Sequence, residues 1–427
     1  MCAKVKKHNS RVRGASSHFG SMVLVLVVLC AVSYGCYVGI AIYRDHRLYQ
    51  QAEHSLAINK LDEARRLLAK YCEDRPRDPD GHFLAARAAR RQRDFAGADD
   101  HLRHCQELGF EPDKLQLEYA MMQAQRDSPD AVEGFLLAKV HDGHADTPVI
   151  LEALIQGYLK TYQIPKALHC LEIWRQHDAE SLQALFWEGM IAEKLANERA
   201  ALAVFEVVVS EEPENREARL HLADLLVGVS KDYERALKHY ERLQCPEAKE
   251  LQVWLGTVAC KIGLNQLDEA ESILRNLRAD HPDEPRILSE CGQLALRLGK
   301  PQEAEEMLRR ALIADPYEPD AVYSYSQALH QLGRTAEAKR YDEKHDAIRA
   351  DLRRLDELGQ QAATNPRNPD LRCEMGVIFL RNGRDLDGVG WLKTALQIDP
   401  RHAPTHQALA DYFERKGMKR EAAEHRR

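Results

Sequence analysis

Histidines spaced three residues apart are the first side chains in this sequence that could do chemistry. His101 and His104 form one such pair, and His141 and His144 form another. Two imidazoles at this spacing share one face of a helix, where they could bind a transition metal ion. Neither pair has a third cysteine or histidine nearby at a ligand spacing, so we interpret all four as solvated helix residues.

Sequence motifs that would indicate catalysis are missing. The chain has no GxSxG, GxxxxGK[ST] or HExxH motif, and no GxGxxG between a strand and a helix. We interpret its four tryptophans as packing residues in helices and not as a ligand cage. They are Trp174, Trp187, Trp254 and Trp391. We therefore expect no enzyme activity, no cofactor and no bound metal.

The composition describes a folded, helix-rich chain. Its 427 residues include 60 Lys+Arg against 67 Asp+Glu, a net charge of −7, with 44% hydrophobic residues. This balance excludes a disordered protein, a polytopic membrane protein and a nucleic-acid binder that works by bulk positive charge. The cysteines beyond residue 43 are scattered and form no CxxC pair, so we expect core thiols and neither a disulfide framework nor a zinc ribbon.

One segment near the N-terminus is suited to cross a membrane. Residues 21–43 carry no charged side chain and exceed the roughly 20 residues that a spanning helix needs. The preceding residues 1–20 hold five Lys and Arg and no acidic residue, which predicts that this tail is cytoplasmic and that everything after Tyr43 lies on the extracytoplasmic, periplasmic side. A cleaved signal peptide is the alternative, although no clean small-x-small site closes the segment.

Small residues recur along the rest of the chain with a period close to 34 residues. Each follows a small-polar turn and an acidic residue. They are Ala64, Ala98, Ala131, Ala167, Ala201, Ala236, Ala270, Ala304, Ala338, Gly388 and Ala422. A second small residue lies twelve positions earlier in several units, for example Gly292 and Gly376. Two small residues that face each other let an antiparallel helix pair approach closely, so each unit is predicted to be a helical hairpin.

Residues that begin or end helices recur at fixed positions within the 34-residue units. Prolines such as Pro282 and Pro316 follow the small residue by twelve positions and should end each second helix. Turns are predicted at Gly299, Gly333, Gly383 and Gly417. First helices are expected to begin at the N-cap and proline pairs Asp78-Pro79, Glu284-Pro285, Glu318-Pro319 and Asn368-Pro369.

This pattern resembles the tetratricopeptide repeat family over nearly all of residues 45–427, most clearly in units 285–318 and 369–402. The resemblance implies an all-α chain, a right-handed solenoid of helical hairpins that follows one transmembrane helix. We expect an array of about nine repeats over 44–349, a long-helix extension or linker over 350–368 and a C-terminal repeat pair over 369–427. The third, sixth and seventh units depart from the pattern by one or two residues.

One step in the array is longer than the period. The distance from Ala338 to Gly388 is 50 residues, and Ile348, Leu352, Leu355 and Leu358 keep helical spacing inside it. This predicts an overlong second helix that runs to about residue 363 and bends or breaks the superhelix. A degenerate half-repeat is the alternative.

In this family, ligands bind in the concave groove that the first helices form. The resemblance therefore implies a set of candidate groove residues at fixed positions of the units. They are Gln156, Lys160, Phe186, Met190, Gln293, Arg297, Tyr323, Gln327 and Arg381. No unit carries the Lys and Asn pair with which chaperone-binding members clamp a C-terminal carboxylate. The alternative is that these are ordinary exposed helix residues.

These features together predict a non-catalytic, membrane-anchored scaffold that binds a protein or peptide in its groove and helps to assemble an envelope or membrane complex. Self-association is possible, and no nucleic acid is expected. An organelle-surface receptor with its repeats in the cytosol shares the same layout. An enzyme or regulatory subunit would need a site on the array. A bacterial envelope-lipid regulator of similar layout would carry a C-terminal metal-binding cysteine module, whereas the last cysteine here is Cys373.

Overall fold

The computed structural model describes residues 39–40, 43–126, 129–244, 250–365 and 367–426. The predicted basic tail at 1–20 lies outside these residues, as does the predicted span at 21–43 apart from residues 39, 40 and 43. Across the described ranges, no helix is both long and apolar enough to cross a bilayer.

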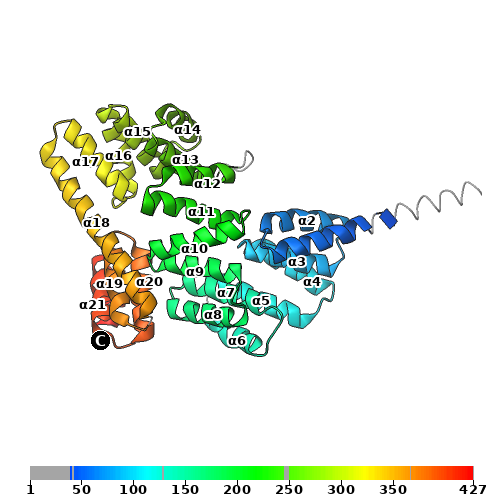
Figure 1. The fold of residues 1–427 in the computed structure, drawn as a ribbon. Coiled ribbons are helices and arrows are strands. Elements are labelled where there is room, and N and C mark those ends of the chain that lie inside the picture. The colour runs from blue at the N-terminus through cyan, green and yellow to red at the C-terminus, as the bar shows by residue number, and fades with distance from the viewer. Residues whose placement is uncertain (1–38, 41–42, 127–128, 245–249, 366, 427) are drawn as a thin grey trace, which may run out of the picture. The chain divides into compact units, whose positions relative to one another are not determined.

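All regular elements in the described ranges are helices, as predicted (Figure 1). The first covers residues 43–57. It is followed by α2 (Leu61–Asp74), α3 (Pro79–Arg91), α4 (Phe95–Glu107), α5 (Pro112–Arg126), the 3₁₀ turn η1 (Pro129–Ala131), α6 (Glu133–His141), α7 (Thr147–Lys160), α8 (Ile164–His177), α9 (Leu182–Lys194), α10 (Glu198–Glu211), α11 (Arg216–Leu225), the π-turn η2 (Leu226–Ser230), α12 (Tyr233–Leu243), α13 (Leu251–Gly263), α14 (Leu267–Asp280), α15 (Pro285–Arg297), α16 (Pro301–Ala314), α17 (Pro319–Gln331), α18 (Thr335–Thr364), α19 (Pro369–Arg381), α20 (Asp385–Ile398), α21 (Ala403–Arg415) and α22 (Lys419–His425).

The chain divides into two compact units, Met1–Tyr119 and Ala120–Arg427, with the boundary inside α5. In both units, consecutive helices pair, for example α3 with α4 and α15 with α16. The hairpin is therefore the local building block of each unit, as the 34-residue period predicted.

Helix ends follow the predicted punctuation with one exception. Asp78, Glu318 and Asn368 each accept a hydrogen bond from a backbone N–H of the first turn that they precede. Glu284 precedes α15 but its side chain makes no capping hydrogen bond. The prolines confirm the helix ends: α14 stops at Asp280, two residues before Pro282, and α16 at Ala314, two residues before Pro316. The four predicted turn glycines all have positive φ, between 69° and 76°.

Small residues occupy the hairpin crossings in almost every unit. Ala304 and Ala270 have no exposed surface, and a Cβ on Gly292 would lie 2.8 Å from Cδ2 of Leu308 in the paired helix. The prediction is wrong for Ala131, which is exposed in η1 because helix α6 begins only at Glu133. Leu136 has no exposed surface and supplies the buried position of that helix.

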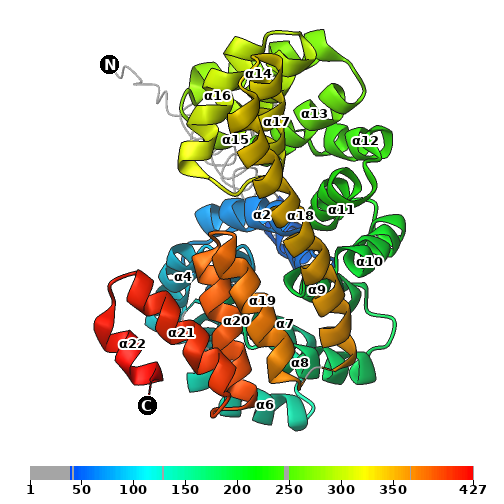
Figure 2. The same ribbon diagram turned by 90° about the vertical axis from the view of Figure 1, so that its left-hand side faces the viewer.

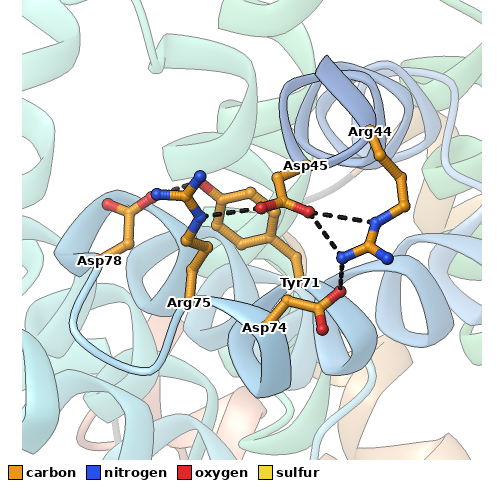
Figure 3. Close-up of polar contacts among 6 residues, drawn as sticks. All are labelled: Arg44, Asp45, Tyr71, Asp74, Arg75 and Asp78. Carbon is orange, nitrogen blue, oxygen red and sulfur yellow. Dashed lines mark hydrogen bonds and ion pairs between the residues drawn. The ribbon is translucent and has the colours of Figure 1, made fainter. Parts of the chain in front are cut away.

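A charged network ties the first helix to α2 in the N-terminal unit (Figure 3). Asp45 is 6% exposed and accepts hydrogen bonds from Arg44 at 3.1 Å and from Nε of Arg75 at 2.8 Å. Arg44 also pairs with Asp74 at 2.8 Å. The hydrogen bond from Arg75 and that from Arg44 hold the pKa of Asp45 below its usual range, against its burial. The helical residues 43–57 are thus fixed to α2.

Helix α18 is the long second helix that the 50-residue step predicted. Its 30 residues end at Thr364, one residue beyond the predicted end. In Figure 2 it runs from the hairpins of α15–α17 to the C-terminal helices α19–α21. Asp351, midway along it, binds the end of α19 through Arg381 and through Nδ2 of Asn382 at 2.7 Å.

Candidate partner-binding surface

In several hairpins of the C-terminal unit, the first helix lies beside the first helix of the next hairpin. Helix α13 packs on α15, α15 on α17, and α19 on α21. A stack of hairpins curves toward the side on which its neighbouring elements approach each other, so these helices form its inner face. The predicted groove residues were assigned to this face.

Four predicted groove residues come together on α15 and α17. Tyr323 has 49% of its surface exposed, Arg297 is exposed, and Gln293 and Gln327 are half-buried. We call these four residues the α15–α17 surface. It offers an aromatic ring, a cation and two amides, and each amide can both donate a hydrogen bond to a peptide backbone and accept one from it.

An imidazole from α18 borders this surface. The ring centroids of Tyr323 and His345 are 5.1 Å apart. The next residue along the chain on the N-terminal side, Lys344, lies with its Nζ 4.8 Å from the ring centroid of Tyr317 in the turn before α17, and 37% of Tyr317 is exposed. His345 and Lys344 were not among the predicted residues, because the approach of α18 to α17 depends on tertiary packing.

Carboxyl groups with raised pKa values lie between α15 and the start of α17. Burial, together with the charges of Asp320 and Glu318, raises the pKa of Glu290 to about 8. Burial likewise raises the pKa of Glu318 to about 7. Oε2 of Glu290 is buried and has no hydrogen-bond partner among the described residues. Burial thus favours the protonated form of Glu290 more than for an ordinary glutamate.

Three further predicted residues lie elsewhere in the unit. Lys160 is exposed and donates a hydrogen bond to the carbonyl oxygen of Arg126. Arg381 is exposed but ion-paired with Asp351. Met190 is half-buried on α9. Two of the three are thus engaged within the chain, and none of them lies on α15 or α17.

The remaining two predicted groove residues are packing residues in this structure. Phe186 is 1% exposed, with its ring centroid 5.3 Å from that of Trp187 and 5.8 Å from that of Phe205. Gln156 is 8% exposed and accepts a hydrogen bond from Gln125 at 2.7 Å. A ligand could contact either side chain only by displacing this packing, so neither forms part of the accessible inner face.

The two histidine pairs are not simply solvated residues on one helix face, as the sequence interpretation had them. His101 is half-buried, and its Nδ1 lies 3.0 Å from Nδ1 of His82, a residue that the spacing analysis missed because it belongs to the preceding helix α3. His141 ends α6, so it shares no helix with His144. Over the described ranges, no group of three or more side chains is suited to hold a metal ion. Trp174, Trp187 and Trp391 are buried, as expected of packing residues.

Comparison with known sequences identifies the repeat. The sequence pattern of the tetratricopeptide repeat family matches residues 188–250, 261–319 and 290–352. These segments match tetratricopeptide repeats. The matched residues include Gln293, Arg297, Tyr323 and Gln327, so the whole α15–α17 surface belongs to recognised repeats. No curated protein sequence matches the chain significantly.

Solved structures resemble the chain only in part. The type IV pilus biogenesis factor PilW is 16% identical over 48% of this chain and 94% of its own, with a TM-score of 0.39. A tetratricopeptide repeat protein from Parabacteroides merdae is 15% identical over 66% of this chain and 98% of its own, with a TM-score of 0.37. Cut9 with Hcn1, from the APC/C, gives 12% identity over 89% of this chain and 86% of its own, with a TM-score of 0.33.

Tetratricopeptide repeats are protein-interaction modules. The family match thus supports binding of a protein or peptide on the repeats.

Proposed function

We propose that this chain is a non-catalytic scaffold that binds an extended protein segment on the α15–α17 surface. The observation that supports this most directly is that four polar and aromatic residues lie exposed or half-exposed on two packed first helices inside recognised repeats. An extended peptide has its own backbone donors and acceptors, which Gln293 and Gln327 can satisfy. Arg297 adds affinity for an acidic side chain in that segment.

The scaffold is anchored in the membrane through residues 21–43 in this proposal, with the repeats on the extracytoplasmic side. The network around Asp45 supports a short spacing between that segment and the repeats, because helical residues 43–57, which follow it directly in the sequence, are fixed to α2 through Arg44 and Arg75. Confinement to the membrane raises the effective concentration of the scaffold toward membrane-bound partners. Assembly of an envelope or membrane complex is the role that this arrangement serves.

Site-specific photocrosslinking tests the binding surface. A photoreactive amino acid replaces Tyr323 in the full-length, membrane-embedded protein, and the matched control replaces Glu306, which is exposed on the second helix α16. We expect a discrete crosslinked partner from position 323 and none from position 306. Equal crosslinking from both positions, or crosslinking from 306 alone, would place the binding surface elsewhere.

Protease accessibility tests the topology. Repeats on the extracytoplasmic side should be digested in intact cells or spheroplasts, whereas a tag at the N-terminus should become accessible only after lysis. The reverse pattern would favour the alternative function, a receptor with its repeats in the cytosol. Loss of residues 1–43 from the mature protein would show that the segment is a cleaved signal peptide.

A further inference from the structure

The C-terminal helices contact a much earlier part of the same unit. The hydroxyl of Tyr162, in the turn between α7 and α8, donates a hydrogen bond to the carboxylate of Asp387 on α20, 225 residues later. Oγ1 of Thr394, about two turns further along α20, donates to the backbone carbonyl of Tyr162. The ring centroids of Tyr162 and Trp391 are 6.2 Å apart in an edge-to-face arrangement. The turn between α7 and α8 is thus inserted against one face of α20.

A cation completes this contact. Nζ of Lys194, the last residue of α9, lies 3.7 Å from the ring centroid of Tyr162 and 3.4 Å from Oδ1 of Asp387. Lys194 therefore binds both the aromatic face and the carboxylate, and its side chain is 27% exposed. One partner thus presents an aromatic ring and a cation, and the other presents an acid.

Two glycines make room for the approach. A Cβ on Gly390 would lie 2.5 Å from Cγ of Tyr162, so any larger residue at 390 would displace the tyrosine. A Cβ on Gly359, in the C-terminal part of α18, would clash with the carbonyl oxygen of Leu195 and lie 3.1 Å from the backbone nitrogen of Asn197. Neither glycine belongs to a crossing of its own hairpin.

Both turns at this contact hold a non-glycine residue at positive φ. Tyr162 has φ of 58° and Ala196 has φ of 56°, and four other non-glycine residues in the described ranges share this conformation: Asn59, Arg93, Lys231 and Asn265. A non-glycine residue with positive φ carries strain. At Tyr162 the side chain on this residue also fills the space beside Gly390, so one residue forms both the turn and the contact.

We propose that Tyr162, Lys194, Leu195 and Asn197 form a second interaction surface, which we call the docking surface, and that its occupant is the chain's own α18–α20 segment. Occupation closes the C-terminal unit on itself. The surface fits a helix that carries an acidic residue followed three positions later by glycine, as Asp387 and Gly390 do. The proposal is independent of what binds the α15–α17 surface.

Energy transfer within the full-length chain tests the closure. A donor and an acceptor dye are introduced through noncanonical amino acids at His169 on α8 and Lys393 on α20, both exposed. Tyr162→Gly removes the docking side chain and relieves the positive φ, so the turn itself is not weakened. Gly390→Val introduces a clash at the same contact. The control is Gly134→Ala on α6, where an added Cβ meets nothing within 4 Å.

We expect high transfer efficiency in the wild type and in Gly134→Ala, and at least a two-fold lower efficiency in both docking variants, with helical circular dichroism preserved in Tyr162→Gly. Efficiency that is unchanged in Tyr162→Gly would overturn the proposal, as would a wild type no more efficient than the variants. Transfer between two singly labelled copies, in place of transfer within one copy, would also overturn it, because the occupant would then be a second chain.

Discussion

Close helix approaches in the C-terminal unit are of two kinds, and both depend on small residues. In the hairpin of α15 and α16, Gly292 faces Leu308 only sixteen positions later, and the 34-residue period repeats this geometry along the chain. At the docking surface, Gly390 faces Tyr162, which lies more than 200 residues earlier in the sequence. The 34-residue period does not predict this contact. The hairpin crossing is local and repeated, whereas the docking contact joins residues that are distant in the sequence.

The two kinds of contact differ in what their loss should do to the structure. A hairpin crossing forms with its own helix pair, so losing it unfolds that pair. The docking contact joins hairpins that are already formed, so losing it can leave the helices intact. Stability along a repeat array is set by each repeat and its neighbours, and a contact between distant repeats adds a separate, breakable constraint.

The largest expected effect is at a hairpin crossing. Ala304→Leu overfills the buried approach of α16 to α15, where Ala304 has no exposed surface. We expect a loss of about 3 kcal/mol of stability and a lower midpoint of urea unfolding, followed by circular dichroism. Arg309→Leu, an exposed position on the same helix, is the matched control and should change the midpoint little. Equal effects at both positions would contradict the crossing geometry.

A smaller effect is expected at the second docking glycine. Gly359→Ala forces the backbone of α18 away from Leu195. This change should destabilise the docked state of the C-terminal unit by roughly 1–3 kcal/mol. Alanine also favours the helix over glycine by up to ~1 kcal/mol, so α18 itself should be more helical. The expected combination is a lower transfer efficiency with undiminished helical circular dichroism. Loss of helix together with loss of transfer would mean that α18 cannot exist without the contact.

Replacing the titratable carboxyl of Glu290 should stabilise the unit near neutral pH. Burial raises its pKa to about 8 in the folded chain, above the roughly 4.3 of an unfolded chain, so the stability that the protonated carboxyl contributes is complete below about pH 4 and is lost as the pH rises toward 8. Glu290→Gln has no such titration, and we expect it to be more stable than the wild type at pH 7, where ionisation of Glu290 stabilises the unfolded wild-type chain. The gain should vanish at pH 4, and a gain that is constant with pH would contradict the assignment.

Acid should weaken the docking contact. Although burial opposes ionisation, the hydrogen bond from Tyr162 and the charges of Arg384 and Lys194 hold the pKa of Asp387 below its usual value. The ionised Asp387 therefore stabilises the docked state at pH values above the pKa of the undocked carboxyl, which is about 3.9. This stabilisation is lost as the pH falls through the lower pKa of the docked carboxyl. We expect transfer efficiency to fall below pH 4 in the wild type and to lose this dependence in Asp387→Asn. Asp385→Asn, whose carboxylate pairs with Lys416 on α21, is the control and should keep it.

The smallest effect on stability is expected on the α15–α17 surface. Gln293→Ala combined with Tyr323→Ala removes half-exposed side chains, so the free energy of unfolding should change by no more than ~0.5 kcal/mol. Capture of the crosslinked partner should nevertheless fall. A large loss of stability in both single variants would show that these residues support the fold.

The sequence predicted what repeats locally. Prolines such as Pro316, turn glycines such as Gly333 and the small residues of the crossings act within one hairpin, so their spacing alone located the helices. The long α18 was visible for the same reason. The packing roles of Phe186 and Gln156 were not predictable, because they depend on which neighbours fill the space around α9 and α7. The docking contact was not predictable, because Tyr162 and Gly390 lie more than 200 residues apart in the sequence. The one sign of it was a glycine at position 390, outside the repeat phase.

Hydrogen–deuterium exchange of the full-length protein tests the central claim, that hairpin stacking and closure are separate constraints. Tyr162→Gly should increase exchange in the α7–α8 turn and along α20 while leaving the α15–α16 hairpin at its wild-type rate. Uniformly faster exchange in all three regions would show a single cooperative unit, and unchanged exchange in α20 would show that the docking contact constrains nothing.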